Sequence, residues 1–362
     1  MKKIAILGTN GIPSKYGGFE TLVEYLVIYL SDKYELTVIC SSITNPDKLT
    51  KYKGCNLEYI PLKANGWQSI FFDIVSIFKS YKDFDKIIIL GASGSVIMPF
   101  FKRYRSKFIF NFGGLDWQRS KWNLFTRKFL KLSESLGIKY SEHLISDNIG
   151  IQEYIQSEYN RDSTLITYGG DQAFKVNPDL SDFEKYQFLR DGYAFSVARI
   201  QPDNNIDLLL ESFDNNSPFP FVLVGNWASC DYGIKTKEKF KNQPNIILLD
   251  AIYEPRELNL LRSNCKVYLH GHSAGGTNPA LVEAMNLGLP ILAFDCIFNK
   301  YTTNFEAEYF SSSVELSQKI ESLSDSRIKA IGDKMYLIAK DLYQWENIAK
   351  KYSEVIEKIE KE

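Results

Sequence analysis

The sequence predicts an α/β protein with two doubly wound, Rossmann-like domains and a cleft between them. The chain has 362 residues, more than one hydrophobic core usually serves. Short β-branched runs alternate with helical patterns, which is the rhythm of a parallel sheet. That rhythm restarts after a polar stretch at residues 175–187. Domains of this kind bind ligands at the carboxyl ends of their strands, so we expect the functional residues just after each strand.

The first domain is predicted at residues 1–175. The opening MKKIAILGTNG has too few apolar residues for a signal peptide and predicts the first strand. The apolar run WQSIFFDIVSIF at 67–78 contains Asp73, so we expect a buried helix rather than a membrane span. The predicted strands are 3–7, 35–40, 87–90, 107–112 and 143–147, with a helix at 18–32.

The second domain is predicted at residues 176–335. A final helical segment, 336–362, is expected to pack back on the N-terminal domain. The predicted strands of the second domain are 193–198, 221–225, 245–249, 266–270 and 290–295, with helices at 205–213 and from residue 279.

Composition excludes several classes of protein. The net charge of -1 gives no global attraction to nucleic acid, and none is expected as a partner. The five cysteines are scattered without a C-x-x-C pair, which favours reduced thiols in a cytoplasmic protein. His270 and His272 form an H-x-H pair without further histidines or cysteines nearby, so we expect neither a metal site nor a cofactor.

Glycines follow the first predicted strand and open the first predicted helix. Their spacing does not fit G-x-G-x-x-G, which argues against a nicotinamide-dependent dehydrogenase. Gly17 and Gly18 at the start of a helix still favour contact with a phosphate or a substrate hydroxyl. The alternative is an ordinary turn between strand and helix.

Three polar residues follow later strands of the first domain. Asp116 and Asp147 are candidates to orient an acceptor hydroxyl or to act as a base. The alternative is that each caps the helix that follows it. Tyr168 ends the domain and is expected to position the acceptor or the transferred sugar.

The stretch GGTNPALVEAM at 275–285 predicts a helix with Asn278 as N-cap and Pro279 at its first position. Gly275 and Gly276 would let a ligand approach the backbone, and the N–H groups from Asn278 to Leu281 would attract an anion. Glu283 would accept hydrogen bonds from sugar hydroxyls; the alternative is a partly exposed helix charge. Thr277 and Leu281 complete this predicted nucleotide-sugar site.

Three further residues follow strands of the second domain. Arg199 comes directly after the strand at 193–198, where its guanidinium can bind a diphosphate; the alternative is a surface arginine. Gly225 and Asp250 follow the next two strands, and Asp250 is expected to line the base pocket.

Residues 102–131 hold nine Lys or Arg and a single acid, Asp116, interleaved with aromatic residues. A basic amphipathic face of this kind predicts contact with an anionic membrane surface. The alternative is a solvated helix whose aromatic residues lie in the core.

The motifs together resemble family 4 of the glycosyltransferases, which has the GT-B fold of two Rossmann-like domains. The stretches GTNGIPSKYGGFETLVEYL, GGLDWQRSKW, SDNIGIQEYI, VARIQPDNNIDLLLESF and HGHSAGGTNPALVEAMNLGLPILAFD resemble a narrower branch. That branch comprises rhamnosyltransferases of bacterial capsule and cell-wall polysaccharide assembly. The resemblance implies an acceptor linked to a lipid diphosphate and a peripheral location on the inner face of the cell membrane.

The resemblance also implies roles for single residues. Glu283 matches the second glutamate of the family's E-x7-E motif, which holds the nucleotide ribose, whereas the first glutamate falls at Gly275. Arg199 matches the diphosphate-binding arginine, and the lysine usual five residues later is Asn204. The implied reaction is metal-independent transfer with retention of configuration, in which the donor phosphate takes the acceptor proton.

The expected donor is dTDP-L-rhamnose. A transferase of the same fold that uses a UDP-hexose is the first alternative, and a ribose 2′-hydroxyl contact to Glu283 would favour it. A catalytically silent nucleotide-sugar binding protein is the second, because Gly275 and Asn204 depart from the family pattern.

Overall fold

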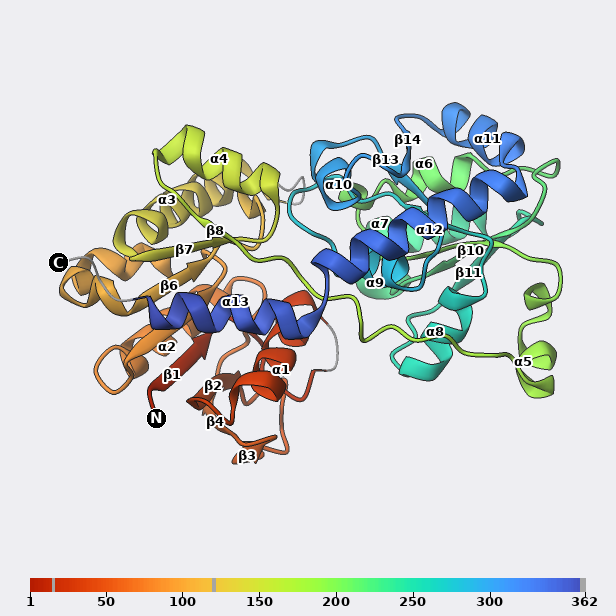
Figure 1. The fold of residues 1–362 in the computed structure, drawn as a ribbon. Coiled ribbons are helices and arrows are strands. Elements are labelled where there is room, and N and C mark those ends of the chain that lie inside the picture. Colours follow the sequence, from red (N-terminus) through yellow and green to blue (C-terminus); the bar gives the residue numbers. More distant parts are fainter. Residues whose placement is uncertain (15–16, 119–121, 359–362) are drawn as a thin grey trace. The chain divides into compact units, whose positions relative to one another are not determined.

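A computed structural model describes residues 1–14, 17–118 and 122–358, apart from the side chain of Asp116. The chain divides into two compact units, one of residues 1–168 with 345–362 and one of residues 169–344. Each unit is a mainly parallel sheet with helices packed on it, so the predicted α/β class is confirmed (Figure 1). The predicted domain borders, 175/176 and 335/336, differ from these divisions, 168/169 and 344/345, by seven and nine residues.

The first unit contains an eight-stranded sheet in the order β3-β4-β2-β1-β5-β6-β7-β8. All its strand pairs are parallel except β3 with β4, an edge hairpin that the sequence analysis missed. The strands are β1 (Lys3–Leu7), β2 (Glu35–Ser41), β3 (Lys51–Tyr52), β4 (Cys55–Ile60), β5 (Lys86–Leu90), β6 (Phe108–Asn111), β7 (His143–Ser146) and β8 (Thr164–Leu165).

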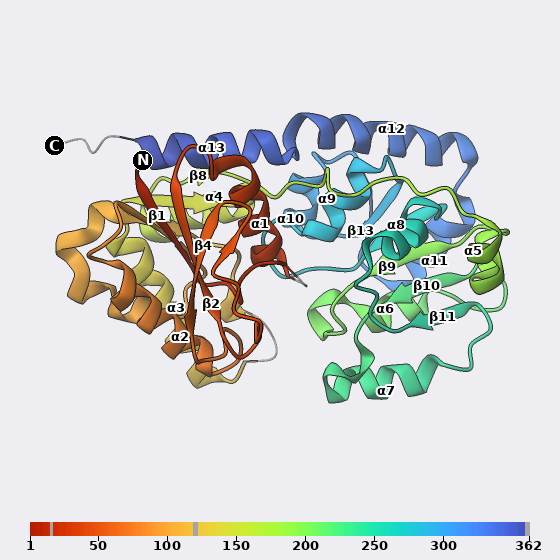
Figure 2. The same ribbon diagram turned by 90° about the horizontal axis from the view of Figure 1, so that it is seen from below.

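Helices cover both faces of this sheet. Figure 2 shows α13 along one face and α2 and α3 on the other. On the first face the Trp345 ring of α13 stacks on Tyr25 of α1 at 4.7 Å between centroids. The helices are α1 (Gly18–Leu30), α2 (Gln68–Ser80), η1 (Ser95–Lys107), η2 (Asp116–Gln118), α3 (Leu124–Tyr140), α4 (Ile149–Tyr159) and α13 (Trp345–Glu357).

The helix α2 differs from its prediction. It is not buried all round, because Phe71 and Phe78 are exposed, as is Trp67 just before it. The sheet-facing side carries Phe72 and the small or polar side chains of Asp73 and Ser76 instead. Asp73 is thus buried together with Phe72 and Ile77, whereas Phe71 and Phe78 are exposed.

The second unit contains six parallel strands in the order β11-β10-β9-β12-β13-β14. The strands are β9 (Ala194–Val197), β10 (Phe221–Val224), β11 (Ile246–Leu249), β12 (Val267–His270), β13 (Ile291–Phe294) and β14 (Glu308–Phe310). Its helices are α5 (Leu180–Lys185), η3 (Gln187–Leu189), η4 (Pro202–Asn204), α6 (Ile206–Glu211), η5 (Trp227–Ser229), α7 (Asp231–Phe240), α8 (Pro255–Ser263), α9 (Pro279–Asn286), α10 (Ile297–Thr302), α11 (Ser313–Ser322) and α12 (Asp325–Leu342).

The centre of this sheet positions the candidate site. β9 pairs directly with β12, so the loops that leave their carboxyl ends are neighbours. The strands are held by a core in which the Phe213 and Phe221 rings stack at 4.9 Å between centroids. The predicted helix at 336–362 is in fact two helices, since α12 ends at Leu342 in the second unit and α13 begins at Trp345 in the first.

Candidate functional site

The loop from β12 to α9 is shaped by its glycines. Gly275 and Gly276 have φ angles of 65° and 79°, a region that side chains beyond glycine rarely adopt. Asn278 caps α9, because its Oδ1 accepts a hydrogen bond from Ala280 N at 3.0 Å, and Pro279 occupies the first helical position. The predicted start of this helix is therefore confirmed. Thr277 and Leu281 are buried beside it.

The start of α9 offers fewer anion donors than predicted. Pro279 has no N–H group, and the N–H of Ala280 is engaged by the cap. The N–H of Leu281 donates to Asn278 O at 3.1 Å. An anion at this helix start would therefore meet the backbone of the preceding loop first.

Glu283 is held by two side chains of the same unit. Its Oε2 lies 2.6 Å from a terminal nitrogen of Arg262, and its Oε1 accepts a hydrogen bond from Gln172 Nε2 at 2.7 Å. The carboxylate side chain is 18% exposed and the arginine side chain 4%. Glu283 is thus a partly exposed helix charge with two protein partners, and its role in holding a nucleotide sugar stays a prediction.

The sequence analysis missed Arg262 and Gln172. Arg262 lies on the buried side of α8, next to Leu261 and one turn after Asn259, whose Oδ1 accepts a hydrogen bond from it at 3.2 Å. An arginine on the apolar side of a helix is a readable signal for a buried ion pair. Gln172 follows the strand region of the first unit and carries no comparable signal.

Two side chains of β12 stay uncharged near pH 7. Burial raises the pKa of Tyr268, with a lowering contribution from Arg262 and a raising one from Glu283. Burial, together with His272, lowers the pKa of His270 to about 3. Tyr268 and His270 therefore add no charge to that of the Arg262–Glu283 pair.

The three residues after β12 make polar contacts with η4 and with Asn205, which follows η4. Gly271 O accepts a hydrogen bond from Asn205 Nδ2 at 2.8 Å, and His272 Nδ1 lies 2.7 Å from Asn204 Oδ1. Ser273 N donates to Asp203 O at 3.0 Å. The loop that carries the glycines is thus fixed to the loop that follows Arg199.

Asn204 links this arrangement to Arg199. It is buried, and its Nδ2 donates to Arg199 O at 2.7 Å. The side chain of Arg199 is exposed at the carboxyl end of β9. The structure therefore brings Arg199, the glycine loop and Glu283 to one edge of the second sheet, as β9 and β12 are neighbours.

Gly225 and Asp250 have local structural partners. A Cβ atom at Gly225 would lie 2.8 Å from the backbone oxygen of Ala198, so close packing there favours glycine. The Asp250 side chain is 82% exposed and pairs with Lys237 at 2.8 Å. Their predicted roles in donor binding stay predictions.

In the first unit the glycine pair opens α1 as predicted. Gly17 is the N-cap residue with a φ of 126°, and Gly18 is the first helical residue. A Cβ atom at Gly17 would lie 2.0 Å from Glu20 Oε2. Glu20, which the sequence analysis missed, accepts hydrogen bonds at Oε1 from Thr9 Oγ1 at 3.2 Å and from the backbone and side-chain nitrogens of Asn10, both at 2.9 Å.

The predicted polar residues after the strands of this unit are mostly buried. Asp147 and Tyr168 are 2% and 6% exposed. Asn148 caps α4 by accepting a hydrogen bond from Gly150 N at 2.9 Å, so the alternative of Asp147 as the cap is wrong. Asp116 begins η2, and its side chain lies outside what the structure describes.

Residues 180–335 match the family model of glycosyl transferases group 1, and residues 1–171 match a domain of unknown function, DUF1972. The chain is a glycosyltransferase. No curated protein matches it.

Solved structures share the fold of this glycosyltransferase over nearly its whole length. Sucrose-phosphate synthase from Thermosynechococcus elongatus is 16% identical with a TM-score of 0.80, and the match covers 98% of each chain. Anabaena HepE in complex with UDP is 14% identical with a TM-score of 0.73, over 98% of this chain and 99% of that one. HepE with UDP and glucose is 13% identical with a TM-score of 0.74, over the same shares. The predicted GT-B class is thus confirmed, and the rhamnosyltransferase branch stays a prediction.

The basic segment of the transferase is not one helical face. Residues 102–131 span η1, the buried strand β6, η2 and the start of α3. Several of its cations have internal partners: Lys107 Nζ donates to Phe84 O at 2.7 Å, and Lys131 lies 4.8–4.9 Å from the ring centroids of Trp117, Tyr154 and Tyr159. The basic residues of this segment therefore come from several elements, and its contact with an anionic membrane surface stays a prediction.

Exposed cations and large apolar side chains nevertheless occur on three helices that pack against one another. η1 packs against α3 and α2, and exposed Phe100, Phe125 and Phe71 come from these three helices. Lys102, Arg103 and Lys128 are exposed in the same elements. In the described part of the chain no helix is long and apolar enough to cross a membrane.

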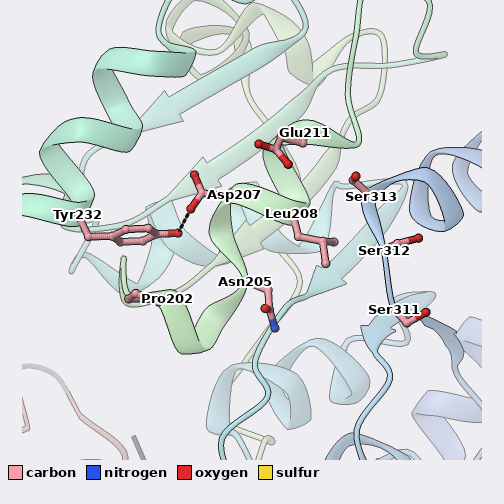
Figure 3. A pocket seen from close by; sticks show the side chains of 9 residues that line it. All are labelled: Pro202, Asn205, Asp207, Leu208, Glu211, Tyr232, Ser311, Ser312 and Ser313. Carbon is pink, nitrogen blue, oxygen red and sulfur yellow. Dashed lines mark hydrogen bonds between the residues drawn. The ribbon is translucent and has the colours of Figure 1, made fainter. Parts of the chain in front are cut away.

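A cavity of about 450 Å³ in the second unit contains none of the predicted site residues. Figure 3 shows Asp207 of α6 pointing toward Tyr232, which donates a hydrogen bond to it at 2.6 Å. Glu211 lines the same cavity and pairs with Lys239 at 2.7 Å. Two carboxylates in its wall disfavour an anionic donor, so we place the candidate site at the glycine loop. The cavity is lined by Pro202, Asn205, Asp207, Leu208, Glu211, Tyr232, Ser311, Ser312 and Ser313.

The histidines of the H-x-H pair have separate environments. Their ring centroids are 6.1 Å apart, and His272 Nδ1 is hydrogen-bonded to Asn204 Oδ1. Among the residues that the structure describes, no three His, Cys, Asp or Glu side chains gather as a metal ion would require.

Proposed function

We propose that this glycosyltransferase moves L-rhamnose from dTDP-L-rhamnose to a lipid-diphosphate-linked sugar in surface polysaccharide synthesis. The transfer retains anomeric configuration and uses no metal. One observation supports this donor site. The Gly275–Gly276 loop leads into α9, which Asn278 caps, and it lies with Arg199 and Glu283 at the carboxyl ends of the neighbouring strands β9 and β12.

The donor diphosphate fits the loop and Arg199. Left-handed glycines let the phosphates approach the backbone, and a guanidinium can bind two phosphate oxygens at once. HepE, which has a similar fold, is described in complex with UDP, and this supports nucleotide binding here.

The nucleoside sugar is proposed to lie against Glu283. Its Oε1 accepts one hydrogen bond from Gln172 and its Oε2 is paired with Arg262, and each oxygen has a further lone pair for a sugar hydroxyl. Arg262 and Gln172 hold the carboxylate in one orientation, so its acceptor directions are set before the donor arrives.

Stabilisation of the leaving diphosphate supplies the main catalytic effect. Arg199 and the loop backbone would stabilise the developing charge, and one well-placed donor contributes roughly 3 kcal/mol. A donor phosphate oxygen takes the acceptor proton, so no strong protein base is needed. Asp116, Asp147 and Tyr168 of the first unit would orient the acceptor.

A UDP-hexose donor is the second candidate. The complex of HepE with UDP and glucose favours it, because that protein shares the fold. The departures at Gly275 and Asn204 favour a third candidate, a binding protein that does not turn its donor over.

We further propose that the transferase works at the inner face of the cell membrane. The exposed phenylalanines and cations of α2, η1 and α3 would contact anionic lipid, with each base near the surface contributing about 1 kcal/mol.

Charge reversal at Lys102, Arg103 and Lys128 should release the protein from phosphatidylglycerol vesicles. Reversal at the exposed Lys235, Lys239 and Lys241 of the second unit is the control, and equal loss with both sets would contradict this surface. Lys121, in the same basic segment, lies outside the described residues.

The experiment that tests the reaction is a donor screen with a lipid-diphosphate-linked GlcNAc or glucose acceptor in EDTA. The panel is dTDP-L-rhamnose, UDP-glucose, UDP-GlcNAc, UDP-galactose and GDP-mannose, read by mass spectrometry of the lipid. A deoxyhexose gain with dTDP-L-rhamnose alone is expected. A hexose gain would overturn the donor, and donor binding without product would favour the binding protein.

A further inference from the structure

His272 is the titratable side chain nearest in sequence to the glycine loop, and it lies at the edge where Arg199 emerges. It follows β12 by two residues, and Arg199 follows the adjacent strand β9 by two. Asn204 contacts both, through Arg199 O and His272 Nδ1. One amide therefore joins the imidazole of His272 to the backbone of Arg199.

The hydrogen bonds of Asn204 fix the protonation of the His272 ring. The Nδ2 group of Asn204 donates to Arg199 O at 2.7 Å, so its Oδ1 is the atom that faces His272 Nδ1 at 2.7 Å. An amide oxygen only accepts, so His272 Nδ1 must carry a hydrogen. The neutral ring then has its lone pair on Nε2, and a second proton there creates a cation without disturbing Asn204.

The backbone of His272 is fixed from two further elements. Asn299 Nδ2 of α10 donates to His272 O at 2.8 Å. A Cβ atom at the preceding Gly271 would lie 2.2 Å from Asn204 O, so the two loops are in close contact. The backbone of His272 is therefore held against the loop that follows Arg199.

The groups packed around His272 permit a positive charge. His270 stays neutral because burial lowers its pKa to about 3, so it adds no competing cation near pH 7. Asp295, which precedes α10, pairs with Lys300 of α10 at 2.6 Å. The charged and titratable side chains on the elements that contact His272 are Arg199, Asp203, His270, Asp295, Cys296 and Lys300.

We propose that the His272 imidazolium, held by Asn204, is a second cation for the donor's diphosphate beside Arg199. This inference rests on the proposed nucleotide-sugar site and names a residue of that site. Because an ordinary histidine titrates near pH 6.5, donor binding should take up a proton at neutral pH. Donor affinity should therefore fall as pH rises.

Calorimetry with UDP-glucose and dTDP-L-rhamnose tests the proposal. Both phosphates of these probes are diesters, so neither titrates between pH 6 and pH 8. We expect affinity to fall about tenfold from pH 6 to pH 8, with proton uptake measured in buffers of different ionisation enthalpy. His272→Asn keeps a donor for Asn204 Oδ1 but does not titrate, so its affinity should stay near the wild-type value at pH 8.

Two matched variants sharpen the test. His143→Asn, at the amino end of β7 in the other unit, should keep the wild-type pH profile. Asn204→Asp places a carboxylate beside the ring and should move the midpoint of the profile to higher pH. Long-range ¹H–¹⁵N spectra of the three histidines give an independent readout, a neutral His272 with its hydrogen on Nδ1.

The outcomes separate this inference from the proposed function. Binding that does not change with pH, an unchanged profile in His272→Asn, or a neutral His272 with its hydrogen on Nε2 would each overturn the role of His272 alone. No binding of either probe at any pH would overturn the nucleotide-sugar site as well.

Discussion

Both units place a glutamate on the helix that follows a glycine pair, and the two carboxylates are held differently. Glu20 of the first unit accepts hydrogen bonds at Oε1 from the uncharged groups of Thr9 and Asn10 in its own strand–helix loop. Glu283 of the second unit pairs with buried Arg262 of another helix.

The difference shows that one local pattern serves two purposes. In the first unit the glutamate holds the loop before its own helix. In the second unit Asn204 and Asn205 hold that loop, so the glutamate is oriented independently of it. A carboxylate that is not needed to fix its loop can bind a ligand, and this favours Glu283 over Glu20 as the donor contact.

Removal of each carboxylate should separate these roles, and among the predictions here it should change the free energy of unfolding most. Glu283→Ala leaves the Arg262 charge buried and should lower the free energy of unfolding by about 3–5 kcal/mol. Glu20→Ala leaves neutral donors unsatisfied and should cost about 1–3 kcal/mol. Urea unfolding measures both values.

A double variant is the control for this prediction. Glu283→Met with Arg262→Met removes both charges and should recover much of the lost stability, because no buried charge is left unpaired. Equal losses in the two single variants, or no recovery in the double variant, would contradict the distinction. Glu283→Gln is therefore the better variant for binding measurements, since it keeps an oxygen for Arg262.

The units should also respond to pH in opposite directions. Burial raises the pKa of Asp73 in the first unit from 3.8 to about 7, so the folded state binds the extra proton and stability falls as pH rises between these values. Burial lowers the pKa of His270 in the second unit from 6.5 to about 3, so stability falls as pH drops below 6.5. From pH 5 to pH 7.5 each effect is about 2 kcal/mol.

Hydrogen exchange measures the two responses separately. After correction for intrinsic rates, amides of α2 and β5 should be better protected at pH 5, and amides of β12 and β13 at pH 7.5. A change of the same sign in both units would contradict the assignment to Asp73 and His270.

A single substitution at Asp73 should remove the pH dependence of the first unit's stability. Asp73→Asn keeps an oxygen for the hydroxyl of Ser93 but cannot ionise, so stability of the first unit should no longer fall between pH 5 and pH 7.5. The gain at pH 7.5 should be roughly 1–2 kcal/mol, because an unpaired amide offsets part of it. Thermal unfolding at both pH values measures it, with exposed Asp83→Asn as the control. An unchanged pH dependence would remove Asp73 as its source.

The sequence could predict what depends on local patterns. Strand KIAIL and the start of α9 occur where they were predicted, because β-branched runs and an Asn-Pro cap are decided within a few residues. The Arg262–Glu283 pair joins residues on two helices, and its geometry depends on tertiary packing. For the same reason α2 was predicted to be buried, since the pattern of apolar residues does not reveal that Asp73 and Ser76 face the sheet.

Replacement of Arg199 should have the smallest effect on stability and a clear effect on donor binding. Its side chain is exposed, so Arg199→Ala should change stability by less than about 0.5 kcal/mol, in contrast to Glu283→Ala. Loss of a guanidinium from a diphosphate should weaken binding of dTDP-L-rhamnose or UDP-glucose about tenfold or more. Arg190→Ala removes an exposed arginine at the end of η3 in the same unit and is the matched control, with little expected change in donor affinity. Donor affinity unchanged in Arg199→Ala would exclude the edge of β9 from the site, and the glycine loop would then have to hold the diphosphate with His272 alone.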